Sequence, residues 1–140
     1  MVIKMKLKLA ISALFTLASV VTADSAQTTT PVNITASTTA TTGAFSASFA
    51  ATSNKTNYIC GFVITSGGSS ASTVVTATIT GTISGTLNYS YVFPSSGQGV
   101  LGVAFPQCII ASAQNTAITV SVPAGGTGTN AALSIWGYRL

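Results

Sequence analysis

The sequence predicts an all-β protein folded as a single antiparallel β-sandwich, of the jelly-roll or the immunoglobulin-like kind, with about seven strands. Short stretches that alternate apolar and polar residues recur at a spacing of about 8–12 residues, with Gly, Ser or Pro between them. No stretch combines the helical period with capping signals. Hydrophobic residues make up 47% of the 140 residues and charged residues only 4%. Apolar material is therefore ample for one sandwich core, and Ser, Thr, Asn and Gly must cover its surface.

The rest of the fold is organised around residues 57–65, NYICGFVIT. Strict alternation places Tyr58, Cys60, Phe62 and Ile64 on one face of a strand and Ile59, Gly61 and Val63 on the other. Because both faces are apolar, we expect this strand to be buried on both sides, or nearly so. It also carries one of the two cysteines, so it is the strand that we expect to be covalently tied to another part of the fold.

The first residues have the layout of a secretory signal peptide. Three lysines precede the apolar run 9–21, and small residues follow it. We expect cleavage after Ala23, because the alternative boundary after Ala26 would put Asp24 awkwardly close before the cut. The alternative for the whole segment is a buried or membrane-anchoring helix, although the run is too short for a comfortable membrane span. The sequence therefore predicts a secreted, periplasmic or cell-surface protein with no membrane span after cleavage.

Residues 24–44 are predicted to be a Thr-rich flexible arm between the signal peptide, residues 1–23, and the sandwich domain, residues 45–140. Within this arm, residues 27–42 have no period that would build a core, so we favour a flexible linker. The alternative is an extended strand that adds to a sheet edge, because the segment is rich in β-branched residues.

Further strands follow from the same alternation. They are expected at residues 45–49, 73–80, 87–93, 100–105, 117–122 and 131–140. In the clearest of them, the core face carries Leu87, Tyr89, Tyr91 and Phe93. Pro106 is expected to end the strand before it. The Gly-rich and Ser-rich stretches 66–72 and 123–130 are expected to be loops.

Cys60 and Cys108 are the only cysteines, an even number in a chain that carries an export signal. Cysteines of exported proteins usually form disulfides, so the sequence predicts a disulfide between Cys60 and Cys108. The alternative is two buried free thiols in a protein that never meets an oxidising compartment. A metal site is not expected, because the chain has no His and no Cys-x-x-Cys spacing, and we expect no cofactor.

The chemistry available to the mature chain is very limited. The formal net charge of +4 comes largely from the lysines of the signal peptide, which leaves Lys55 and Arg139 as cations and Asp24 as the only acid. Without a cluster of Lys and Arg, the folded body offers no electrostatic footprint for nucleic acid. Without His or Glu, it has no general base for acid–base or nucleophilic catalysis. We therefore expect a protein that is not an enzyme and does not bind nucleic acid.

Three aromatic residues are the candidate ligand-contacting side chains: Trp136, Tyr138 and Tyr58. A flat apolar surface with polar neighbours suits the stacking of a sugar ring. Alternation puts Trp136 and Tyr138 on the face opposite the aliphatic side chains of their strand. The alternative, which we favour, is that the three aromatic side chains fill the core or cover a sheet edge.

The most distinctive stretch of the chain is NTAITVSVPAGGTGTN, residues 115–130, which is followed by Gly137 and Tyr138. Together with the rest of the sequence from residue 55 onward, this stretch resembles small uncharacterised proteins of bacteriophages, prophages and proteobacteria. The resemblance implies a β-rich structural protein associated with virions, with no catalytic residues to carry over. A signal peptide departs from what a phage structural protein assembled in the cytoplasm would have, which favours a secreted or surface relative.

Two functions follow from these observations as expectations. The first is an exported structural or surface-assembly protein, related to phages or prophages. An uncharged β domain rich in Thr, Ser and Gly, with a flexible arm, can pack against copies of itself or against a larger surface through shape and backbone pairing. The alternative is a secreted carbohydrate-binding module that uses exposed aromatic residues, above all Trp136 and Tyr138.

Overall fold

The computed structural model describes residues 30–140, which contain eight strands and no helix. The strands are β1 (Val32–Thr41), β2 (Phe45–Phe49), β3 (Asn57–Gly67), β4 (Thr73–Thr82), β5 (Gly85–Phe93), β6 (Gln98–Ile110), β7 (Ile118–Val122) and β8 (Asn130–Arg139). The all-β fold predicted from the sequence is confirmed, and β1 is the strand that was not counted among those expected. The predicted signal peptide lies outside the described residues.

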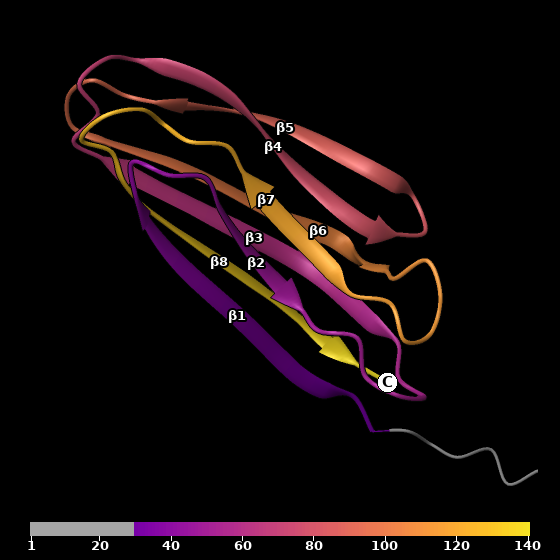
Figure 1. Cartoon of the computed structure of the whole chain (residues 1–140). Helices are drawn as coiled ribbons and strands as arrows, with labels where there is room; N and C mark the ends of the chain where they lie inside the picture. Colours follow the sequence, from indigo (N-terminus) through magenta and orange to yellow (C-terminus); the bar gives the residue numbers. More distant parts are fainter. Residues whose placement is uncertain (1–29) are drawn as a thin grey trace, which may run out of the picture.

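The strands form two antiparallel sheets of four, β1-β8-β3-β6 and β2-β7-β4-β5, which we call the β1 sheet and the β2 sheet. The first strand pairs with the last, the second with the seventh, the third with the sixth and the fourth with the fifth. The chain is thus one antiparallel ribbon that doubles back at the β4–β5 turn and is rolled into two layers (Figure 1). This nested pairing is the jelly-roll arrangement, one of the two sandwich kinds expected.

The core lies between the two sheets and is filled by side chains that alternate along the strands. The largest fully buried apolar side chains are Phe62, Phe93, Ile59, Ile64, Ile79, Ile118, Leu133, Ile135, Val120 and Val122. The core faces predicted for β4, β5 and β7 are confirmed, although Leu87 and Tyr89 are only half-buried. The Ser, Thr and Asn residues between the core positions lie outward, because successive side chains of a strand point to opposite faces.

A β-bulge at Cys60 interrupts the alternation of β3. The register between β3 and β8 skips this residue, so two residues of β3 stand opposite one residue of β8. The strict alternation predicted for this strand is therefore wrong across the bulge. Ile59 shares the core face with Phe62, whereas Tyr58 and Cys60 are half-buried on the outside of the sheet.

β1 occupies most of the segment in which a flexible linker was expected. It pairs with β8 along its whole length. The linker interpretation fails here, and the alternative of an extended strand at a sheet edge describes the segment. Alternation gave a weak signal because no residue of β1 is fully buried, and inward side chains such as Ile34 and Ala36 are only half-buried. The sandwich therefore begins at β1 rather than at residue 45.

β6 runs through Pro106 instead of ending before it, so the predicted strand end is wrong. Pro106 lies in the stretch between Ala104 and Ile109, where β6 leaves its register with β3. The missing amide hydrogen of the proline thus interrupts no regular ladder. β6 is also an edge strand of its sheet, which is where proline is tolerated within a strand.

Candidate functional site

The three predicted ligand-contacting residues, Tyr58, Trp136 and Tyr138, lie together on the outer face of the β1 sheet, and we call them the aromatic cluster. Tyr58 and Tyr138 stand opposite each other on β3 and β8. Their rings stack with centroids 4.5 Å apart and an interplanar angle of 11°. Trp136 is two positions from Tyr138 on β8 and so shares its face. All three side chains are half-buried, so the cluster lies outside the core while part of it is covered.

Trp136 covers a glycine on the neighbouring strand. Gly61 of β3 stands opposite Trp136 in the register, and a Cβ atom at position 61 would overlap the Cζ2 and Cε2 atoms of the indole. The indole therefore occupies the space of the missing side chain, an arrangement that shields the backbone at a glycine in a sheet. Part of the tryptophan surface is committed to the fold, and only the remainder is available to a ligand.

A hollow of about 320 Å³ lies beside the aromatic cluster. Trp136 and Tyr138 of β8 line it together with Asn33 and Thr35 of β1. The lining contains no charged side chain, so it offers aromatic surface, an amide, a hydroxyl and a phenol. Sequence reasoning missed Asn33 and Thr35 because they lie in the segment interpreted as a linker. The apolar residue between them, Ile34, was the available signal that this segment alternates.

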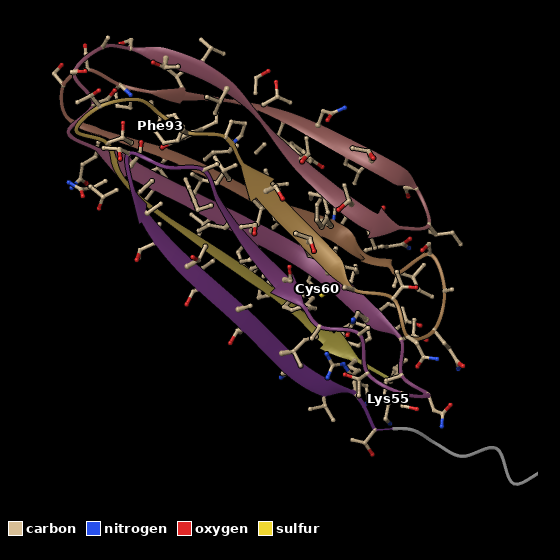
Figure 2. All side chains as sticks on the ribbon, viewed as in Figure 1. Lys55, Cys60 and Phe93 are labelled. Atoms are coloured by element: carbon tan, nitrogen blue, oxygen red, sulfur yellow. A yellow bond between two sulfur atoms is a disulfide. The ribbon has the colours of Figure 1, made fainter. Side chains whose placement is uncertain are left out.

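The predicted disulfide is confirmed. Cys60 of β3 is bonded to Cys108 of β6, with their Cα atoms 4.1 Å apart. The bond joins the two strands where their pairing is irregular, at the bulge in β3 and at residues 105–108 of β6. Cys60, labelled in Figure 2, also lines the hollow beside the aromatic cluster. The disulfide therefore holds in place the part of β3 that lies under this cluster.

Arg139 is a structural residue and not a free cation. Its Nε donates a hydrogen bond to Oδ1 of Asn57 at 2.7 Å, and its Nη2 donates to the carbonyl oxygen of Ala50 at 2.9 Å. Asn57 is 1% exposed, and the two N–H groups of its amide are shared among three carbonyl oxygens within 3.3 Å. Lys55 is the one other charged side chain in residues 30–140, and it lies at the end of the sandwich near the C-terminus (Figure 2). Neither cation takes part in the aromatic cluster.

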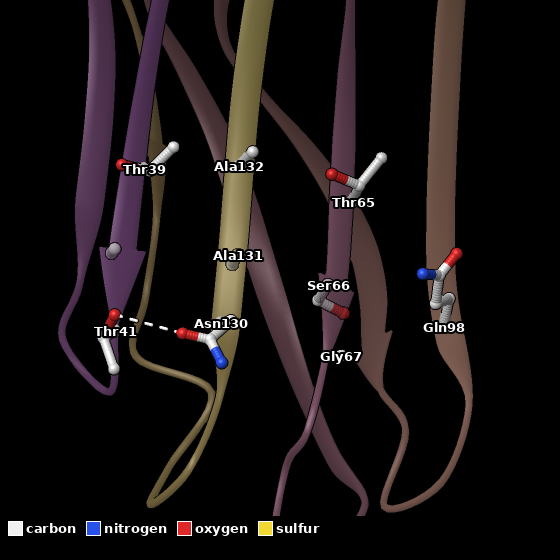
Figure 3. A pocket seen from close by; sticks show the side chains of 10 residues that line it. Thr39, Thr41, Thr65, Ser66, Gly67, Gln98, Asn130, Ala131 and Ala132 are labelled. Carbon is white, nitrogen blue, oxygen red and sulfur yellow. Dashed lines mark hydrogen bonds between the residues drawn. The ribbon is translucent and has the colours of Figure 1, made fainter.

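A larger hollow of about 700 Å³ lies at the other end of the same outer face. Figure 3 shows its lining, to which Thr39 and Thr41 of β1, Asn130 of β8, Thr65 of β3 and Gln98 of β6 contribute. The hydroxyl of Thr41 donates to Oδ1 of Asn130 at 3.1 Å. This lining has no charged and no aromatic side chain. The outer face of the β1 sheet thus has an aromatic end and a polar end, both uncharged.

Within residues 30–140, no group of three or more His, Cys, Asp or Glu side chains is placed to hold a metal ion. The same part of the chain contains no helix long and apolar enough to cross a membrane. Comparisons with protein-family models, with curated proteins and with solved structures found no match. The function is therefore inferred from the chain's own geometry and chemistry.

Proposed function

We propose that this protein is an exported, non-enzymatic structural protein that assembles with copies of itself or on a larger surface through backbone pairing and shape. The observation that carries the proposal is the absence of charged residues from all the strands at the sheet edges. These strands are β1 and β6 in the β1 sheet and β2 and β5 in the β2 sheet.

Uncharged edge strands favour association between chains. Each edge presents a row of N–H and C=O groups without a partner, and sheet proteins commonly block pairing there with Lys, Pro or a bulge. In this sandwich, β6 has such features in Pro106 and the irregular stretch that contains it. β1 has none of them. Addition of a strand from another chain at such an edge needs no charge on either side.

The outer faces of the sheets are also poor in charge. Val74 and Val92 stand opposite each other on β4 and β5 and are 70% and 50% exposed, among Ser and Thr residues of the β2 sheet. Val100 of β6 is 66% exposed on the outside of the β1 sheet. A neighbouring copy can cover such a surface without burying an unpaired charge. The outer faces therefore support the same proposal as the edges.

Two further observations and one expectation from the sequence support the proposal. The disulfide fits a protein that is exported, because such bonds persist in oxidising compartments. Residues 30–140 contain no His, Asp or Glu, which suits a role that needs no general acid or base. The resemblance to phage and prophage proteins that the sequence suggests from residue 55 onward suits the structural class, although the comparisons found no match.

Sedimentation velocity of the mature protein over a wide range of protein concentrations tests the proposal. Assembly predicts a sedimentation coefficient that rises with concentration. The association should depend little on salt, because the edge strands carry no charged side chain that could form an ion pair between copies. A protein that stays monomeric throughout, and that remains soluble when the producing cells are fractionated, would contradict the proposal.

The hollow beside the aromatic cluster favours a second candidate function, a carbohydrate-binding module. A neutral sugar suits its lining, since a sugar ring stacks on aromatic surface while its hydroxyls need amide and hydroxyl partners. A glycan array followed by calorimetry tests this candidate. Binding that is lost in Asn33→Ala and Thr35→Ala but kept in Thr41→Ala, at the far end of the same strand, would support it. Failure of every neutral glycan to bind would remove it.

A further inference from the structure

We propose that the free edge of β1 pairs with the same edge of a second copy, so that two four-stranded β1 sheets join around a two-fold axis. This inference rests on the proposed self-assembly and names its surface and its partner. Figure 1 shows β1 at the margin of its sheet, where β8 is its neighbour. The other side of β1 has no strand partner in residues 30–140.

The backbone of β1 leaves the hydrogen-bonding groups of every second residue without a strand partner in the described part of the chain. Just beyond the strand, the amide of Thr42 donates to the carbonyl oxygen of Thr129 at 2.8 Å. Because backbone groups alternate in direction along a strand, the even-numbered residues point theirs toward β8. The odd-numbered residues therefore direct N–H and C=O groups to the free edge: Asn33, Thr35, Ser37, Thr39 and Thr41.

No feature of β1 itself blocks pairing at this edge. Its register with β8 runs without a shift over ten residues, so the strand is regular. It contains no charged residue and no proline, and its odd-numbered side chains are all exposed on the outer face. The edge is about 34 Å long at the rise of an antiparallel strand. Neither charge nor proline within β1 therefore opposes a strand from a second copy along this edge.

The other edges are less suited to pairing. β2 spans only five residues, and β6 is irregular around Pro106. The edge of β5 is approached by β6, because a Cβ atom at Gly99 would lie 3.0 Å from the carbonyl oxygen of Val92. At the β4–β5 turn, the amide of Ile83 donates to the carbonyl oxygen of Ile110, the last residue of β6, at 3.0 Å. β1 is therefore the longest edge strand with a regular register, and its outward side chains are exposed, although β2 of the other sheet lies near it.

The free edge of β1 is complementary to itself about a two-fold axis at Ser37. In an antiparallel pair with this centre, Ser37 stands opposite Ser37 of the second copy. Thr35 then stands opposite Thr39, and Asn33 opposite Thr41, so that outward-directed backbone groups meet each other throughout. All these side-chain pairs are uncharged and can hydrogen-bond across the strands. A second copy of the chain therefore provides hydrogen-bond partners for the outward N–H and C=O groups along the whole edge of β1.

Charge substitution at the axis tests this register. Ser37→Lys and Ser37→Glu each place like charges opposite each other, so each is expected to raise the dissociation constant several-fold at low salt. An equimolar mixture of the two variants is expected to associate again, because the axis then joins a Lys to a Glu. Ser134→Lys is the matched control. Ser134 stands opposite Ser37 on the same outer face but lies on β8, one strand away from the edge, and its substitution should leave the association unchanged.

Ser37→Pro is an independent variant, because it removes an amide directed at the free edge and keeps the pairing with β8. Since Ser37 is exposed, thermal unfolding should show that every variant keeps the fold. Oligomers that survive all substitutions at Ser37 would overturn the pairing of β1 and leave the proposed assembly standing. If the Lys and Glu variants lose association and their equimolar mixture does not regain it, the two-fold axis does not lie at Ser37. A wild-type protein that is monomeric at every concentration would overturn both proposals.

Discussion

Trp136 lies over Gly61, the residue that stands opposite it on the neighbouring strand. Gly61 directly follows the extra residue of the β3 bulge, Cys60, so this contact links the bulge to the aromatic cluster. A side chain at position 61 would push the indole away from the sheet. The hollow shared with Asn33 and Thr35 would then change shape. The candidate sugar site thus depends on a residue that has no side chain.

Gly61→Ala is expected to lower the free energy of unfolding by about 1–3 kcal/mol, the usual effect of overpacking a filled site. The added methyl group would meet the indole of Trp136 and the carbonyl oxygen of Val103. Urea denaturation measures the change. Gly102→Ala on β6 is the control, because a Cβ atom there has no neighbour within 4 Å, and its effect should stay within about 0.5 kcal/mol. Equal effects of the two substitutions would contradict the contact.

Removal of the disulfide by the double substitution Cys60→Ser and Cys108→Ser is expected to lower the free energy of unfolding by about 4 kcal/mol. The bond closes a loop with a sequence separation of 48, which restricts the unfolded chain. Guanidinium denaturation with and without a reducing agent measures the effect. The reducing agent should bring the wild type to the level of the variant and leave the variant unchanged. A wild type that is indifferent to reduction would show that the bond adds no stability.

Asn57→Ala is expected to lower the free energy of unfolding by about 3 kcal/mol, because it leaves buried carbonyl groups and Arg139 without their partner. Chemical denaturation measures the loss. Asn88→Ala is the matched control, since Asn88 is exposed on β5 and its replacement should change stability little. If the two variants are equally stable, Asn57 does not brace the end of the sandwich.

Thr129→Val is expected to raise the free energy of unfolding by about 1 kcal/mol. The Oγ1 atom of Thr129 is buried and has no hydrogen-bond partner in residues 30–140, and valine keeps the shape without the desolvated hydroxyl. Ser66→Ala should have the opposite effect, because it breaks the buried hydrogen bond between the hydroxyls of Ser66 and Tyr91, which are 2.6 Å apart. Thermal unfolding of both variants measures the contrast. Destabilisation by Thr129→Val would contradict the first expectation.

Alternation predicted the strands in which neighbouring residues differ sharply in polarity. In β7, Ile118, Val120 and Val122 are buried as expected, since Thr and Ser separate them. The bulge in β3 was not predictable in this way. The residues on both sides of Cys60 are apolar, so a strand with an extra residue fits the pattern as well as a regular one. The side of the sheet on which Tyr58 lies follows from this bulge, which is why its placement needed the structure.

β1 was misjudged for a different physical reason. Its inward residues are small or β-branched and only half-buried, so the contrast between its two faces is weak. What makes it a strand is the long-range pairing with β8, and apart from the weak alternation around Ile34 such pairing leaves little local trace in the sequence. Asn33 and Thr35, the polar residues of the candidate site, were therefore not predicted either. The aromatic residues of the site could be predicted, because a spacing of two residues places Trp136 and Tyr138 on one face of a strand.

Because the first strand pairs with the last, the nested pairing joins residues ever farther apart in the sequence, from the β4–β5 turn out to β1 and β8. β4 and β5 are joined by a tight turn, whereas β1 and β8 meet only after every strand between them has been made. Contacts between residues far apart in the sequence form slowly, since the chain must lose the entropy of a long loop first. We therefore expect the pairing of β1 with β8 to form late, with β1 unpaired until β8 reaches it. Before then, a neighbouring chain could supply β8 instead, so a high concentration of folding chains is expected to favour dimers that have exchanged this strand.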